Sequence, residues 1–142
     1  MTESEEIIAS ADEQYRQGRF KDAHINYGKA LSRGTQREGY CRRMRGMCSR
    51  RVAEQRLQKA RDDPDRREAF LVQSARWLAK AEANLESALE EADAHQQRVL
   101  REEQALTEEL MAEFMRLTGG DPGRRLSEAA RYRQEAAESL GA

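Results

Sequence analysis

The sequence predicts an all-α protein, and three observations support this fold class. Of the 142 residues, 38% are hydrophobic and 36% are charged, a balance typical of helical and coiled-coil proteins. Only two prolines are present and 6% of the residues are aromatic, which disfavours a large β-sheet core. Hydrophobic residues recur at intervals of three and four along most of the chain, which is the period of helices that bury one face.

A helical hairpin is expected at the start of the chain. Thr2 and Glu5 have the spacing of a capping box, which favours a first helix over about residues 3–17. Gly18 ends this helix, because glycine adopts left-handed backbone angles without a clash at Cβ. A second helix is expected over about residues 20–32, antiparallel to the first because the turn is short. The helical positions of this hairpin are Ile7, Ile8, Ala11, Tyr15, Phe20, Ala23, Tyr27, Ala30 and Leu31.

A third helix is expected to end near residue 60. Thr35 and Glu38 again have the spacing of a capping box, ahead of further hydrophobic residues at helical intervals. Cys41 and Cys48 lie on one face of this helix, about 10 Å apart at 1.5 Å of rise per residue. That separation is too large for a disulfide, so we expect two buried thiols.

Pro64 is expected to separate the third helix from a long one. Asp63 is positioned to cap the new helix with Pro64 at its first position. Neither glycine nor proline occurs within residues 65–117, which favours a single helix and possible coiled-coil contacts. A hairpin that turns near residues 92–98 is the alternative. The core heptad positions would be Leu71, Leu78, Leu85, Ala92, Val99 and Leu106, then Ala75, Glu82, Leu89, Gln96, Glu103, Leu110 and Leu117.

The last predicted element is a short C-terminal helix over about residues 123–139. It follows the clearest loop in the chain, residues 118–123, with Asp121 as cap and Pro122 at the first helical position. Its narrow alanine-rich stripe suits close docking against another helix but buries little area. The stripe consists of Leu126, Ala129, Ala130, Arg133, Ala136, Ala137 and Leu140.

The first hairpin resembles the tetratricopeptide repeat (TPR), a helix pair with a Gly-x-Tyr/Phe turn followed by Ala, an aromatic residue and Ala-Leu. The resemblance covers about residues 4–60, is better in the second helix than in the first, and includes no second copy of the turn motif. A three-helix module of this kind also looks like the MIT domain, and the sequence does not separate the two. Both families imply binding of a protein or peptide. The matching TPR-like packing residues are Gly18, Phe20, Ala23, Tyr27, Ala30 and Leu31.

The two parts of the chain carry opposite charge. Residues 1–60 contain 13 Lys/Arg and 8 Asp/Glu, whereas residues 61–142 contain 12 and 18. Arginines of the third helix are candidates for binding carboxylates of an acidic protein partner or, less favoured, phosphates of nucleic acid or membrane. The alternative is a solvated face neutralised by the acidic part of the same chain. The candidate basic face comprises Arg42, Arg43, Arg45, Arg50, Arg51 and Arg56.

Four large apolar residues are possible interface anchors, although Trp77 is more readily explained by packing inside the protein. His24 and His95 are expected to be exposed helical residues. No phosphate loop, nucleophile elbow or metal-ligand spacing occurs, so we expect no enzymatic activity, cofactor, metal or small-molecule substrate. The possible anchors are Trp77, Met111, Phe114 and Met115.

The sequence therefore predicts three parts: a TPR-like three-helix module at residues 1–62, a long helix at 63–118, and a loop with a C-terminal helix at 119–142. The expected function is a non-enzymatic adaptor or scaffold that binds an acidic or amphipathic peptide or helix, with a homodimer possible. The alternative is a structural coiled-coil subunit of an assembly. We expect a cytoplasmic protein, because no run of about 18 apolar residues occurs and the first residues are acidic.

Overall fold

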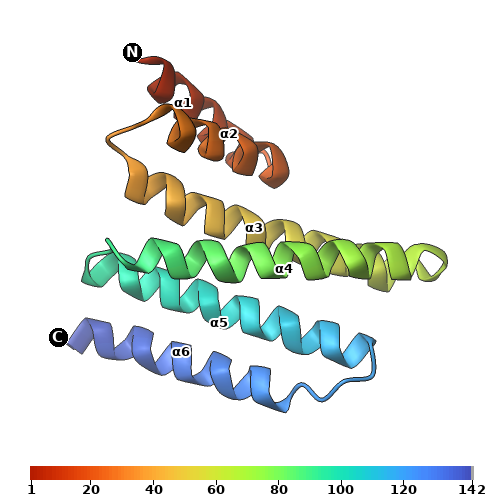
Figure 1. The fold of residues 1–142 in the computed structure, drawn as a ribbon. Coiled ribbons are helices and arrows are strands. Elements are labelled where there is room, and N and C mark those ends of the chain that lie inside the picture. The colour runs from red at the N-terminus through yellow and green to blue at the C-terminus, as the bar shows by residue number, and fades with distance from the viewer. Residues whose placement is uncertain (142) are drawn as a thin grey trace.

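The computed structural model describes the backbone of residues 1–141 and the side chains of residues 1–138. Within these residues all regular secondary structure is helical, as predicted. The helices form three antiparallel hairpins, α1 with α2, α3 with α4 and α5 with α6, stacked in chain order (Figure 1). The elements are α1 (Glu3–Arg16), α2 (Phe20–Arg33), α3 (Glu38–Asp62), the 3-10 helix η1 (Pro64–Arg66), α4 (Arg67–Leu89), α5 (Ala94–Leu117) and α6 (Gly123–Gly141).

The hairpin of α1 and α2 forms as predicted, because local hydrogen bonds fix both ends of α1. The Thr2 hydroxyl accepts from the Glu5 amide at 3.2 Å, and the Glu5 carboxylate accepts from the Thr2 amide, which completes the capping box. Gly18 has a φ of 78°, and the Arg19 amide donates to the Gln14 carbonyl at 2.9 Å. A side chain at Gly18 would be strained at this angle, so the turn requires glycine.

Helices α1, α2 and α3 share the first hydrophobic core. Asp12 of α1 connects all three, because its carboxylate accepts hydrogen bonds from the hydroxyls of Tyr27 on α2 and Tyr40 on α3, the latter at 2.6 Å. Cys41 and Cys48 are buried free thiols, as predicted. Small residues let the helices approach closely. The buried members of this core are Ile8, Ala11, Ala23, Tyr27, Ala30, Cys41 and Cys48.

Helices α3 and α4 pack along their lengths, and a glycine permits their close approach. A Cβ on Gly46 would lie 2.7 Å from Cδ2 of Leu85 and 3.3 Å from the Leu85 backbone nitrogen, closer than packed atoms tolerate. One turn further along α3, the Ser49 hydroxyl accepts from the Asn84 side-chain amide at 3.1 Å. The sequence offers no local signal for the close approach at Gly46, because Leu85 lies about forty residues further along the chain.

Two predicted helix caps are absent. Thr35 does not cap α3, since its hydroxyl accepts from the Arg37 amide at 3.1 Å and the helix starts without a side-chain cap. Asp63 makes no capping hydrogen bond either, and Pro64 begins the short helix η1 before α4. Thr35 lies two residues before the first capping position of α3, which is Arg37, so it is misplaced for a cap.

The prediction of one long helix over residues 65–117 is wrong, and the hairpin alternative is correct. The chain reverses between α4 and α5 at a capping box, in which Asp93 accepts from the Gln96 amide at 2.8 Å and Gln96 accepts from the Asp93 amide at 3.0 Å. A capping box starts a helix without glycine or proline. The reversal brings Leu85 and Leu100 into one fully buried cluster, so no coiled coil spans the segment.

Helix α3 contributes residues to two hydrophobic cores. The predicted division between residues 62 and 63 therefore cuts between α3 and the helices α4 and α5, which share the second of these cores with it. One face of α3 packs against α1 and α2. Its opposite side contributes Ala53 to a second cluster with Leu78 of α4 and Met111 of α5.

The loop before α6 forms where it was predicted, but the helix begins at Gly123, so Pro122 precedes it and does not occupy its first position. Gly119 has a φ of 84°, and the Asp121 carboxylate accepts from the Gly123 amide at 2.9 Å. Ala129 and Ala136 of the predicted stripe are buried, and α6 packs against α5.

Candidate protein-binding surface

Arg50 lies inside the protein and not on a face that a partner can reach. Its side chain is 7% exposed, and its guanidinium contacts the carboxylate of Glu103 on α5 at 2.7 Å and 3.3 Å. A further contact joins it to Glu54 at 2.6 Å. The expectation that Arg50 binds a partner is therefore corrected: the acidic part of the same chain neutralises this charge.

Two other predicted arginines of α3 also have intramolecular contacts. Arg42 lies 3.7 Å from Glu38 and 3.6 Å from Glu91, which is a loose pair of ion contacts. The guanidinium of Arg51 lies over the ring of Phe20 on α2, 4.7 Å from its centroid. The predicted arginines thus point to different neighbours, and they do not form one continuous face.

The remaining three predicted arginines keep their charge unneutralised. Arg43, Arg45 and Arg56 are half-buried, and none has a carboxylate within 4.0 Å among the described residues. The Arg45 guanidinium lies against α2 beside Gly28, with Nε 3.6 Å from where a Cβ of Gly28 would be. Arg45 therefore faces the space between α2 and α3.

The residues that resemble the TPR motif pack the first hairpin. Phe20, Ala23, Tyr27 and Ala30 are buried, Gly18 forms the turn, and Leu31 packs partly buried against the same core. These residues pack the hairpin itself, so they offer a partner little accessible surface.

Three of the four possible anchors pack within the chain. Trp77, Met111 and Phe114 belong to the cluster around Leu78, because α5 folds back along α4. Met111 and Phe114, which were possible interface anchors, therefore pack against Leu78 inside the protein. Met115 is half-buried near the start of the last loop.

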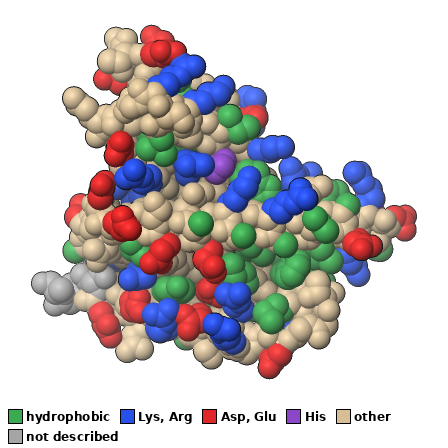
Figure 2. All heavy atoms as spheres, in the orientation of Figure 1, with side chains coloured by type: hydrophobic (Ala, Val, Ile, Leu, Met, Phe, Trp, Pro, Cys, Tyr) green, Lys and Arg blue, Asp and Glu red, His purple; other side chains and the backbone are tan. Residues whose placement is uncertain are grey.

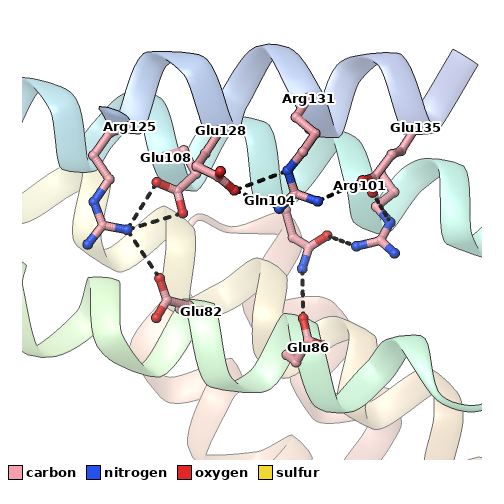
Figure 3. Close-up of polar contacts among 9 residues, drawn as sticks. All are labelled: Glu82, Glu86, Arg101, Gln104, Glu108, Arg125, Glu128, Arg131 and Glu135. Atoms are coloured by element: carbon pink, nitrogen blue, oxygen red, sulfur yellow. Dashed lines mark hydrogen bonds and ion pairs between the residues drawn. The ribbon is translucent and has the colours of Figure 1, made fainter. Parts of the chain in front are cut away.

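A polar network that sequence reasoning missed joins α4, α5 and α6 (Figure 3). Arg125 of α6 lies 3.2 Å from Glu108 of α5 and 3.6 Å from Glu82 of α4. Burial raises the pKa of the Glu108 carboxyl, and the Arg125 guanidinium counters part of that effect. The sequence gives no sign of this contact unless the α4–α5 hairpin is already known.

A second group of polar contacts joins the same three helices further along α5 (Figure 3). The Gln104 side chain donates to Glu86 of α4 at 3.3 Å and accepts from Arg101 at 2.9 Å, and Arg101 lies 3.1 Å from Glu135 of α6 (Figure 3). A cavity of 20 Å³ beside it holds about one water molecule. These contacts therefore hold α4, α5 and α6 together.

Exposed cations gather in the first half of the protein. Figure 2 shows Lys and Arg side chains over α2, α3 and the adjoining part of α4. On α2, two lysines flank Ile25, which is 46% exposed, and on α4 Arg76 lies between Val72, which is 49% exposed, and Lys80. None of these four cations forms an ion pair among the described residues. We call this set the basic surface: Lys21, Ile25, Lys29, Val72, Arg76 and Lys80.

His24 connects the two rows of the basic surface, contrary to the expectation that it is exposed. Its side chain is 8% exposed, and its ring meets Trp77 of α4 edge-on with centroids 5.1 Å apart. Burial lowers the pKa of His24 to about 4, and the positive charges of Arg45 and Lys80 act in the same direction. Trp77 and Lys80 of α4 and Arg45 of α3 lie around this histidine, and local sequence carries no sign of their approach.

Comparison with known proteins gives no family for this chain. It matches no family model, no curated protein and no solved structure. In the part of the chain that the structure describes, no group of three or more His, Cys, Asp and Glu could hold a metal ion. No helix there is long and apolar enough to cross a membrane.

Proposed function

We propose that this protein is a non-enzymatic adaptor that binds an acidic, amphipathic segment of another protein through the basic surface. The observation that supports this function is the pair of cationic rows on α2 and α4, each beside an exposed aliphatic residue and without an ion pair to any carboxylate of residues 1–138. Several arginines of α5 and α6 instead pair with nearby glutamates, so these helices offer a partner less positive charge.

The chemistry of the basic surface fits a peptide better than a nucleic acid. Ile25 and Val72 would bury aliphatic side chains of a partner helix, while the flanking cations attract its carboxylates and orient it. A phosphate backbone would use the cations and leave the two aliphatic residues exposed. The TPR-like or MIT-like character of α1 to α3 favours the same conclusion, since both families bind peptides. A coiled-coil assembly role, in contrast, required the long helix that the reversal at Asp93 interrupts.

The direct test is fluorescence anisotropy with the full-length protein and a fluorescein-labelled helical peptide of about five turns that alternates Glu with Leu at helical spacing. A peptide with Gln in place of Glu is the control for charge. We expect saturable binding of the acidic peptide only, weakening as salt rises from about 50 mM to about 300 mM. The double substitution Lys21→Glu/Arg76→Glu should weaken binding about tenfold or more, because it places like charges opposite the peptide.

Arg116→Glu/Arg124→Glu is the matched control, because it also reverses two charges, on exposed arginines of α5 and α6 outside the basic surface. It should change the affinity less than about twofold. Equal effects of the two charge reversals would show that only net charge matters and would overturn the proposal. Tighter binding of a single-stranded RNA of equal charge would also overturn it and would identify a phosphate-binding protein.

A further inference from the structure

His24 and its neighbours form a cationic and aromatic cluster at the point where α2 meets α4. We define the His24 cluster as His24, Arg45, Trp77 and Lys80. The histidine ring lies edge-on to Trp77, with an interplanar angle of 81°. Lys80, one turn after Trp77 on α4, has its ammonium 4.4 Å from the centroid of the Trp77 ring. Residues from three helices therefore meet here in one place.

Two polar atoms of this cluster are buried without any hydrogen-bond partner. They are Nε2 of His24 and Nε of Arg45. Buried nitrogen donors are nearly always paired in folded proteins, because an unpaired one costs about 1–3 kcal/mol. Both atoms belong to the same cluster, and a hydrogen-bond partner that reached either of them would stabilise the protein.

The charges around His24 all have the same sign. The side chains that perturb its titration are Arg45 from α3 and Lys80 from α4, and both disfavour a proton on the ring. Trp77 contributes an apolar edge. Neither Arg45 nor Lys80 forms an ion pair among the described residues. A single negative charge at this position would relieve the repulsion between the cations and supply the missing acceptor.

We propose that the His24 cluster seats one carboxylate side chain of the bound acidic segment, which rests on the proposed function of the basic surface. In this arrangement His24 Nε2 and the Arg45 guanidinium donate to the carboxylate oxygens. Lys80 is exposed, so its side chain turns aside to admit the carboxylate and then pairs with it. The aliphatic residues Ile25 and Val72 would hold the apolar side of the same segment.

Trp77 makes this proposal testable by fluorescence, because it is the one tryptophan of the sequence and it lies in the cluster. An unlabelled acidic peptide without tryptophan is titrated into the full-length protein while Trp77 emission is recorded. We expect the emission to change with the same midpoint as the anisotropy of the labelled peptide. His24→Phe keeps an aromatic ring against Trp77 but removes the donor, and should weaken binding about tenfold.

Three further variants separate the chemistry of the site from its packing. His24→Gln retains a side-chain donor and should bind more tightly than His24→Phe. Arg45→Met removes the charge at similar size and should weaken binding about tenfold, with a less than additive effect when combined with His24→Phe. His95→Phe changes an exposed histidine on α5 and should leave affinity unchanged. Circular dichroism at the binding temperature verifies that each variant is folded.

The outcomes distinguish this inference from the proposed function. Peptide binding with unchanged Trp77 emission and with full affinity in folded His24→Phe would overturn the carboxylate seat and leave the basic surface intact. Absence of binding by the wild-type protein would overturn both. Equal affinities of His24→Gln and His24→Phe would show that packing, and not hydrogen bonding, explains any loss.

Discussion

Arg50 and Glu103 provide the sharpest test of how the helices are arranged, because they pair across α3 and α5 although 53 residues separate them. Both side chains are nearly buried, at 7% and 10% exposure. Arg50 has a second carboxylate within reach, Glu54 at 2.6 Å, whereas the described contacts of the Glu103 side chain are all with Arg50. The two partners should therefore respond differently to substitution.

Removing the arginine should cost more than removing the glutamate charge. Arg50→Met leaves the Glu103 carboxylate buried without a cation, which should lower the free energy of unfolding by about 3–5 kcal/mol. Glu103→Gln keeps a hydrogen-bond acceptor, and Arg50 retains Glu54, so the expected loss is about 1–3 kcal/mol. The double variant Arg50→Met/Glu103→Leu replaces both charges with apolar groups and should be more stable than Arg50→Met alone.

Urea unfolding followed by circular dichroism measures these differences, with unchanged m-values as the sign of an intact native state. Losses below about 1 kcal/mol for both single variants, or a double variant that is no more stable than Arg50→Met alone, would contradict a buried pair. Either result would also argue against the α4–α5 hairpin, since a straight helix carries Glu103 away from Arg50.

Three further predictions concern stability. Gly46→Ala should lower the free energy of unfolding by about 1–2 kcal/mol in urea titrations, because its Cβ meets Leu85, while Gly39→Ala, whose nearest neighbour is a flexible arginine tip, should stabilise the protein slightly. Burial raises the pKa of Glu108 above its unfolded value, so wild-type stability is lost as pH rises through the pKa of the folded protein. Glu108→Gln does not titrate at this position, so its free energy of unfolding should increase relative to that of wild type between pH 4 and pH 7. Burial instead lowers the pKa of His24 from 6.5 to about 4, so its contribution is complete above pH 6.5 and is lost as pH falls toward 4. Thermal melts at pH 5 and pH 7 should show this loss in wild type and not in His24→Phe.

Local signals in the sequence predicted most of the helices. The Thr2–Glu5 capping box, the turn at Gly18 and the glycine-rich loop before α6 involve residues within a few positions of one another, and each has a direct structural counterpart. The absence of glycine and proline favoured a single helix over the α4–α5 hairpin, which was the alternative. The Asp93–Gln96 capping box was the relevant signal, and it lies within residues 92–98, where that alternative places the turn.

The candidate site was less accessible to prediction, because it depends on contacts between distant helices. A row of arginines on one helix does not show which of them contact carboxylates: Arg50 pairs with Glu103, whereas Arg45 pairs with no carboxylate in the described part of the chain. His24 appeared to be an exposed helical residue, since its burial depends on Trp77 from another hairpin. Once α4 is known to lie beside α2, both residues stand out as unpaired polar groups.

The measurement that tests the central claim most directly is a nuclear magnetic resonance titration of the isotope-labelled full-length protein with the acidic helical peptide. The account predicts that amide shifts change along residues 21–29 of α2 and 72–80 of α4, together with the indole signal of Trp77. Shifts confined to α5 and α6, or the same pattern with the glutamine peptide, would contradict an acidic partner on the basic surface.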